Sequence, residues 1–90
     1  MILPETHYRS SSKSADGTVK TGPGFLGGIQ VTASASGVIR LYDNTAASGT
    51  VLIDQIAVFA GDCYEWPIEF TTGLYFDLVS GTATVTIFYI

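Results

Sequence analysis

The sequence predicts an all-β protein: a small antiparallel β-sandwich or jelly roll of seven or eight short strands, preceded by an extended N-terminal arm. Apolar and polar residues alternate with a period of two through most of the chain, and no segment has the 3.6-residue period of an amphipathic helix. Turn-forming residues recur every ~8–12 residues, which is typical of sandwiches. Ninety residues suit one domain. We therefore divide the chain into an arm, residues 1–17, and a β-sandwich domain, residues 18–90.

The arm differs from the rest of the chain in composition. Residues 10–17 (SSSKSADG) are small and polar, and the large apolar residues of the arm are Ile2, Leu3 and Tyr8, which follow no period. We interpret the arm as an extended segment with apolar anchors at its start and a flexible serine-rich stretch behind them. A disordered tail without a function is the alternative.

The first strands of the domain show clear alternation. Residues 29–34 alternate apolar and polar side chains, the pattern of a half-buried strand. Ser36–Gly37 predicts a tight hairpin turn, because glycine supplies the positive φ that such a turn needs. Residues 39–42 then form the next strand, and a connection rich in turn formers spans residues 43–49.

The following strand changes its phase. Val51 and Ile53 share one face, whereas Ile56 and Val58 fall on the opposite parity. The slip at Asp54–Gln55 predicts a β-bulge or a crossing from one sheet to another.

A break at Gly61–Asp62 leads into a short predicted strand, Cys63–Trp66. Pro67 closes this strand, because proline cannot donate to a ladder, and we place it on an edge or at a corner. The turn expected at Pro67 would separate the faces of Glu65 and Glu69.

The C-terminal part of the domain predicts three further strands. Residues 68–70 end at a turn, Thr71–Gly73, and residues 74–79 alternate strongly. A second two-residue turn, Ser80–Gly81, precedes a strand over residues 82–89.

The residues that carry chemistry do not combine into a catalytic site. His7, the single histidine, lies in the arm, where no packing holds it beside a serine and a carboxylate. His7 is also the one imidazole that could deprotonate Cys63 and make it a nucleophile. We therefore expect Cys63 to be a buried structural cysteine. We interpret the acidic group Asp62, Glu65 and Glu69 as a solvated rim, because calcium needs about six to eight convergent oxygens. We expect no enzyme activity, no cofactor and no metal.

Charge limits the partners. The chain has a net charge of -4, and residues 21–90 hold one arginine against six acidic residues. This acidic body argues against nucleic acid and anionic membranes, which need clustered lysine and arginine. No run approaches the ~18 apolar residues of a transmembrane helix. Charged residues are only 13% of the chain, about half the usual share, so we expect other subunits to cover part of the surface.

Two further observations indicate the cellular compartment in which the chain folds. The single cysteine excludes an internal disulfide, and Met1–Glu5 lacks the basic and apolar segments of a secretory signal. We therefore expect the chain to fold in a reducing cytoplasm and to leave it later as part of a particle.

Several aromatic residues are candidates for an interface. By parity, three of them face away from the predicted core: Tyr42, Tyr75 and Phe88. Together with Tyr64 and Trp66 they are scattered surface aromatics, a subunit or particle interface, or a platform for stacking sugars; these three interpretations stay open. The predicted interface residues of the body are Tyr42, Trp66, Tyr75 and Phe88, and those of the arm are Ile2, Leu3, His7, Tyr8 and Arg9.

The strand and turn segments of residues 21–90 resemble small virion proteins of tailed bacteriophages. The segments that carry the resemblance are GPG and GIQVTA within residues 22–33, LYDN at 41–44, ASGTVL at 47–52, FTTGLY at 70–75 and SGTATVT at 80–86. Such proteins are short β-sandwiches and include capsid decoration, or cement, proteins. The resemblance implies a structural role in the virion and brings no catalytic residue.

The expected function is therefore that of a capsid decoration protein that stabilises contacts between capsid subunits through its arm and an oligomeric interface. The partner would be the phage capsid or another virion protein, and the protein would act as a homo-oligomer assembled in the host cytoplasm. A trimer would match the local three-fold axes of a capsid. The alternative is a tail- or fibre-associated module that recognises a host-surface glycan through Tyr42, Trp66 or Tyr75.

Overall fold

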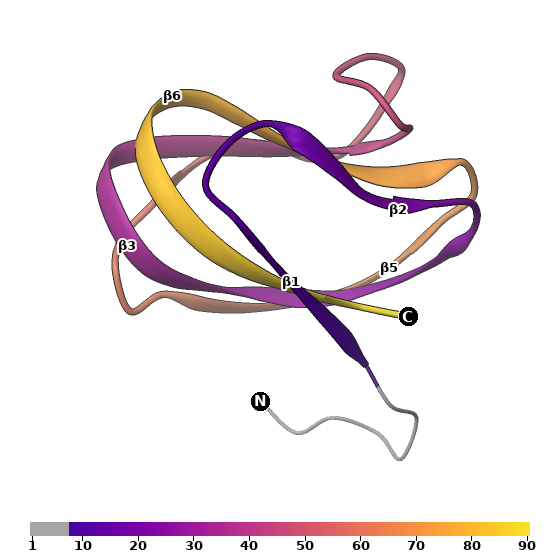
Figure 1. Cartoon of the computed structure of the whole chain (residues 1–90), viewed down its shortest axis with the longest axis horizontal. Coiled ribbons are helices and arrows are strands. Elements are labelled where there is room, and N and C mark those ends of the chain that lie inside the picture. Colours follow the sequence, from indigo (N-terminus) through magenta and orange to yellow (C-terminus); the bar gives the residue numbers. More distant parts are fainter. Residues whose placement is uncertain (1–7) are drawn as a thin grey trace.

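Residues 8–90 are described by the computed structural model, and they form six strands in one antiparallel sheet (Figure 1). The strands are β1 (Arg9–Lys13), β2 (Gly17–Thr21), β3 (Gly24–Asp43), β4 (Thr50–Val58), β5 (Cys63–Phe70) and β6 (Gly73–Tyr89). The prediction of an all-β antiparallel fold is confirmed. In this part of the chain no helix is long and apolar enough to span a membrane.

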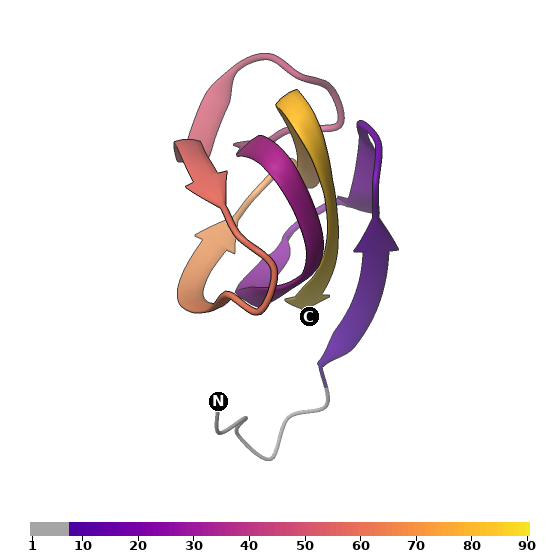
Figure 2. The same ribbon diagram turned by 90° about the vertical axis from the view of Figure 1, so that its left-hand side faces the viewer.

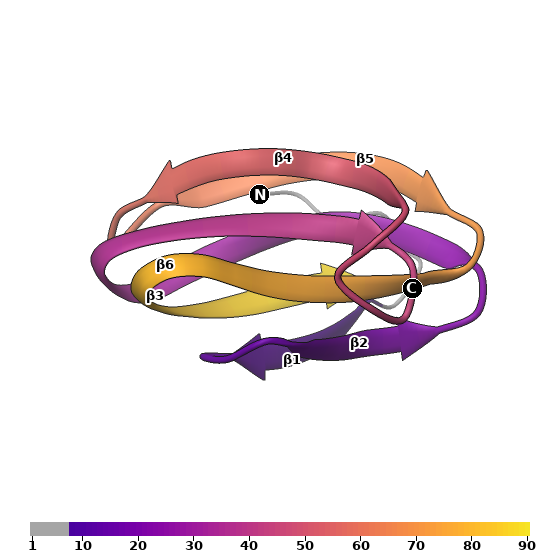
Figure 3. The ribbon, with the colours of Figure 1, turned by 90° about the horizontal axis from the view of Figure 1, so that it is seen from above.

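Two long strands, β3 and β6, form the centre of the sheet and pair with each other along most of their length. Both β4 and β5 pair with the other side of β3, and both β1 and β2 pair with the other side of β6. Among the described strands the sheet therefore has two free edges, the β4/β5 edge and the β1/β2 edge, which lie on opposite sides of the molecule (Figures 2 and 3).

Both central strands bend back sharply near their middle (Figure 1). Ser36 in β3 and Gly81 in β6 have positive φ, 54° and 68°. A Cβ atom at Gly81 would overlap the carbonyl oxygen of Ser36, so the two bends stack in contact. The predicted hairpin turns at Ser36–Gly37 and Ser80–Gly81 are thus wrong: each is a bend inside a continuous strand, because β3 and β6 stay paired on both sides of it.

The bends bring the inner faces of the two halves of the sheet together around an apolar core. Its members come from the four strands β3, β4, β5 and β6: Leu26, Ile29, Val31, Ile39, Leu41, Val58, Phe70, Leu74, Phe76, Ala83, Val85 and Ile87. No polar or charged side chain of the described residues is buried. The core therefore depends on apolar packing, which is the dominant favourable term in folding.

The predicted count of seven or eight strands is not confirmed. Three pairs of predicted strands are fused, into β3, β5 and β6, whereas residues 9–13 and 17–21 form two strands that the sequence did not predict. The serine-rich stretch of the arm is not flexible, since Ser10–Ser12 pair with residues 86–88 of β6. The division of the chain at residue 17 stays a prediction.

Other local predictions have mixed outcomes. The slip at Asp54–Gln55 is confirmed as a bulge opposite Arg40. Pro67 lies on an edge strand as predicted, but β5 continues through it, so Glu65 and Glu69 share one exposed face. The expected burial of Cys63 is wrong, because it lies on that same exposed face.

Candidate functional site

A row of charged side chains crosses the half of the sheet formed by β2, β6, β3 and β4. We call it the polar row, and it consists of Asp16, Asp77, Arg40 and Asp54. Arg40 and Asp77 are register partners on β3 and β6, and the Arg40 Nε donates to Asp54 Oδ1 at 3.2 Å. Asp16 reaches the row from the residue before β2, and its Oδ1 accepts from the backbone amide of Leu78 at 2.7 Å.

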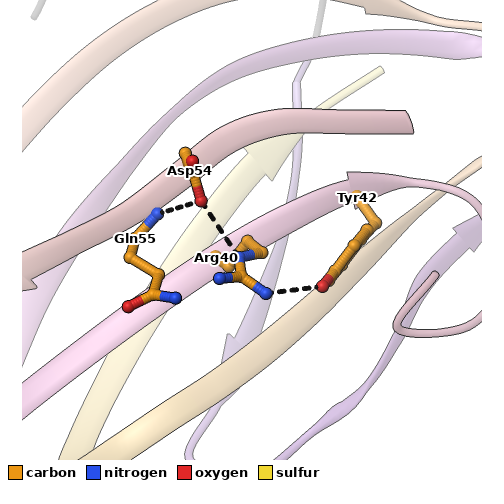
Figure 4. Close-up of polar contacts among 4 residues, drawn as sticks. All are labelled: Arg40, Tyr42, Asp54 and Gln55. Carbon is orange, nitrogen blue, oxygen red and sulfur yellow. Dashed lines mark hydrogen bonds and ion pairs between the residues drawn. The ribbon is translucent and has the colours of Figure 1, made fainter. Parts of the chain in front are cut away.

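Arg40 is the centre of this row (Figure 4). Its Nη1 donates to the hydroxyl of Tyr42 at 2.8 Å, and Asp54 Oδ1 also accepts from the backbone amide of Gln55 at 2.7 Å. The hydrogen bond to Tyr42 raises the pKa of Arg40, although desolvation opposes it, and Asp54 adds to the increase. The guanidinium therefore stays charged and holds its neighbours in place.

The surroundings of Asp77 favour its neutral form, whereas those of Arg40 favour its charged form. Desolvation raises the pKa of its carboxyl, the negative charge and hydrogen bond of Asp16 raise it further, and Arg40 counteracts them. A raised pKa in a carboxyl pair is a property that general acids use.

Within residues 8–90, no group of three or more His, Cys, Asp or Glu side chains is arranged to hold a metal ion.

A second carboxylate, Asp43, ties the end of β3 to the β5–β6 turn. It accepts hydrogen bonds from the backbone amides of Thr71, Thr72 and Gly73, at 2.8–3.3 Å, and from the Thr71 hydroxyl at 3.2 Å. Desolvation raises the pKa of Asp43, but these hydrogen bonds outweigh it and lower the pKa below the ordinary value. Asp43 is therefore a structural clamp. No pattern in the sequence pointed to it.

Phe59 is the most exposed large apolar residue among the described ones. Its side chain is 66% exposed in the β4–β5 turn. Its backbone amide donates to Asp62 Oδ2 at 2.9 Å, and its carbonyl accepts from the Asp62 amide at 3.0 Å. Val31 is hydrogen-bonded to both Gly61 and Asp62 of the turn, at 2.8 Å each. The turn thus presents Phe59 from a well-fastened backbone. The sequence signal for this residue is an aromatic side chain two positions before the break predicted at Gly61–Asp62.

An aromatic stack lies on the inner face of β5. The rings of Tyr64 and Trp66 are 4.8 Å apart between centroids, with an interplanar angle of 14°. The Tyr64 hydroxyl donates to Asp62 Oδ2 at 3.1 Å; desolvation, with Asp62 second, raises the pKa of Tyr64. The stack belongs to a set of half-exposed apolar side chains on β4 and β5 that pack against the core, which we call the apolar seam: Leu52, Ile53, Ile56, Tyr64, Trp66 and Ile68.

A shallow hollow of about 390 Å³ lies beside the bends of the central strands. Its lining consists of small residues from β3, β6 and the β1–β2 turn: Ser14, Ala33, Ser34, Ala35, Thr82, Ala83 and Thr84. This lining contains no charged group, so it supplies neither an acid nor a base for chemistry.

Of the predicted arm residues, Ile2, Leu3 and His7 lie outside the described residues. Tyr8 is half-buried, and its ring covers Gly27 of β3, where a Cβ atom would lie 2.6 Å from a ring carbon. Arg9 is exposed at the start of β1.

Of the predicted body residues, Tyr42 is a correction. Its side chain is only 7% exposed, and the Arg40 guanidinium lies 5.8 Å from the ring centroid and donates to the hydroxyl. Tyr75 is half-buried as the register partner of Tyr42. Trp66 and Phe88, also half-buried, lie elsewhere, on β5 and near the end of β6. The four residues do not form one patch.

Comparison with known proteins gives no match: no family model, no curated protein and no solved structure matches this chain.

Proposed function

We propose that this protein is a structural component of a bacteriophage virion, a capsid decoration protein that stabilises contacts between capsid subunits by adhesion. We also propose that its folded sheet is a β-sandwich of the jelly-roll kind, with the two halves of the bent sheet as its layers. The observation that carries the functional proposal is Phe59, a large apolar side chain exposed on a fastened turn.

The geometry of the β4–β5 turn suits adhesion. Burying a phenylalanine side chain contributes roughly 1.5–3 kcal/mol. Because hydrogen bonds already hold the backbone of Phe59, little ordering entropy opposes the contact. One such contact per copy is weak, but many copies on a shell act together when they are linked.

The arm is a second contact in this proposal. Arg9 is exposed at the start of β1, and Tyr8 anchors the chain just before it on Gly27. In this proposal the predicted anchors Ile2 and Leu3 contact a neighbouring capsid subunit.

The test is binding of the purified protein to phage shells that lack it, measured by co-sedimentation. We expect Phe59→Ala to weaken binding about tenfold, which corresponds to the loss of ~1.4 kcal/mol. Phe25→Ala is the matched control: Phe25 is also exposed, but it lies at the start of β3, where its backbone pairs with that of Ile90. Equal binding by the Phe59→Ala variant and the wild type would contradict the proposal.

The glycan-binding alternative is an outcome of the same experiment. It would be favoured if the protein did not bind shells and bound host glycans in a manner lost on Trp66→Ala. The burial of Tyr42 already removes one of the three aromatic residues on which that alternative relied.

A further inference from the structure

The two free edges of the sheet are chemically complementary. The β4/β5 edge carries the apolar seam, and residues 50–70 contain four acidic residues and no lysine or arginine. At the β1/β2 edge, residues 8–21 contain three basic residues and one acidic residue. Opposite charge on two surfaces favours their association and guides their orientation.

The inner face of β1 carries the cations that matter. Arg9, Ser11 and Lys13 are register partners of residues 89, 87 and 85 of β6, which belong to the core or pack against it. Arg9 and Lys13 therefore point toward the inner side of the sheet at its edge, and neither forms an ion pair within residues 8–90. Lys20, in contrast, is occupied: its ammonium donates to the carbonyl of Pro23 at 2.5 Å and to that of Ile90 at 3.4 Å.

The equivalent positions on β5 carry aromatic rings. Tyr64 and Ile68 are register partners of Ile29 and Leu26, which are core residues, so the aromatic stack and Ile68 face the same inner side. A strand β1 placed beside β5 would set Arg9 and Lys13 against Tyr64 and Trp66. A cation over an aromatic face is attracted by the ring quadrupole, and long basic side chains cover apolar surface with their stems.

Strand direction allows this contact in both halves of the sheet at once. In one half the order β1, β6, β3, β5 is antiparallel throughout, so a β1 from another copy added beside β5 continues the alternation. In the other half the order β2, β6, β3, β4 has the same property for a β2 added beside β4. A two-fold contact between two β4/β5 edges would instead bring the acidic residues of both copies together.

We propose that copies of this protein associate head to tail, with the β1/β2 edge of one copy against the β4/β5 edge of the next. Each half of the sheet then continues into the next copy, and the backbone groups of the two edges pair, apart from Pro67 of β5, which has no amide to donate. A head-to-tail contact generates a closed ring or a filament, and a ring of three would match the symmetry expected from the sequence. The inference concerns the isolated protein and holds whether or not the assembly binds a shell.

The test uses two charge-reversed variants of the full chain, Arg9→Glu/Lys13→Glu and Glu65→Lys/Glu69→Lys, with mass measured by analytical ultracentrifugation. Glu65 and Glu69 lie on the outer face of β5, so the second variant reverses the charge of the β4/β5 edge without changing the aromatic residues that Arg9 and Lys13 would contact. The wild type should associate, less so at high salt, and each variant alone should associate at least tenfold more weakly. Mixing the two variants should restore association, because each provides the edge that the other lacks. Ala46→Glu/Ala47→Glu, two exposed positions in the β3–β4 connection, controls for added negative charge and should behave as the wild type.

Trp66 offers a second readout, since it is the single tryptophan. Its fluorescence should shift to shorter wavelength as the wild-type concentration rises, and should stay constant for Arg9→Glu/Lys13→Glu. A single-copy mass for the wild type at millimolar concentration would overturn the inference. So would undiminished association of Arg9→Glu/Lys13→Glu, which is the result that a two-fold β4/β5 contact predicts, or failure of the mixture to associate.

Discussion

Asp43 and Asp77 are both partly buried aspartates on the two long central strands, yet their surroundings are opposite. Asp43 ends β3 and faces only donors, three backbone amides and one hydroxyl. Asp77 lies in the middle of β6 between a cation, Arg40, and another carboxylate, Asp16. The pKa of Asp43 is accordingly lowered and that of Asp77 raised, although desolvation is the largest influence on both and raises both.

The difference teaches that the supply of donors decides how a carboxylate contributes to this sheet. A turn that has not formed its own ladder offers three free amides, and Asp43 satisfies them. The middle of a paired strand offers none toward its face, so Asp77 depends on side chains alone. Stability therefore rests on Asp43 more than on the polar row.

The largest effect is expected for Asp43→Ala. The substitution leaves the amides of the β5–β6 turn without their acceptor, and hydrogen bonds to charged groups contribute about 1.5–3 kcal/mol each where they are well formed. Because the site is partly exposed and water replaces some of the bonds, we expect a loss of about 2–3 kcal/mol in the free energy of unfolding at pH 7. Urea denaturation measures it.

The pH dependence sharpens the prediction for Asp43. Its folded pKa lies below its unfolded value, so its contribution is present above the unfolded pKa and is lost as the pH falls through the folded pKa. The difference between wild type and Asp43→Ala should therefore shrink below about pH 4, the ordinary range for Asp. A difference that stays constant down to pH 2 would show that the clamp does not work through the carboxylate.

An intermediate effect is expected for Arg40→Met, which keeps the length of the side chain and removes its charge. The hydroxyl of Tyr42, whose residue is only 7% exposed, then loses this donor, and Asp77 loses the cation that lowers its pKa. We expect a loss of about 1–2 kcal/mol at pH 7 in urea denaturation, since an unpaired buried polar group costs roughly that much.

Asp54→Asn is the matched control for the polar row. Asp54 is 83% exposed, and exposed ion pairs contribute little. It should therefore cost less than ~0.5 kcal/mol while the bond from Arg40 to Tyr42 remains. A loss as large as that of Arg40→Met would mean that the ion pair, and not Tyr42, makes Arg40 important.

Local patterns explain which parts of the fold could be predicted. The bulge at Asp54–Gln55 could be predicted from the sequence because it changes the parity of apolar residues within one strand. The turns at Ser36–Gly37 and Ser80–Gly81 were not distinguishable from bends, because the same positive φ serves both. What differs is whether the flanking segments pair with each other or with another long strand, and this depends on residues about 45 positions away.

The site residues show the same limit. Parity placed Tyr42 on the outer face, but only the three-dimensional structure shows the guanidinium that covers it. At β5 the expected strand end at Pro67 hid a regular alternation that continues from Tyr64 to Phe70. On an edge strand the missing amide of proline points away from the ladder, so proline does not end the strand there. The clamp of Asp43 joins residues 28–30 positions apart, a distance that no local pattern reports.

The smallest effect is expected for Asp77→Asn, and its sign is opposite to that of the other variants. The folded pKa of Asp77 is raised, so its stabilising contribution is fully present below the unfolded pKa and is lost as the pH rises through the folded pKa. At pH 7 the charged carboxylate therefore opposes folding, and the neutral amide removes its repulsion with Asp16. We expect a gain of up to ~0.5 kcal/mol at pH 7 and none at pH 3, where Asp77 is protonated, measured by urea denaturation at both values. A loss of stability at pH 7 would mean that attraction to Arg40 outweighs Asp16, and the contrast with Asp43 would then be one of degree only.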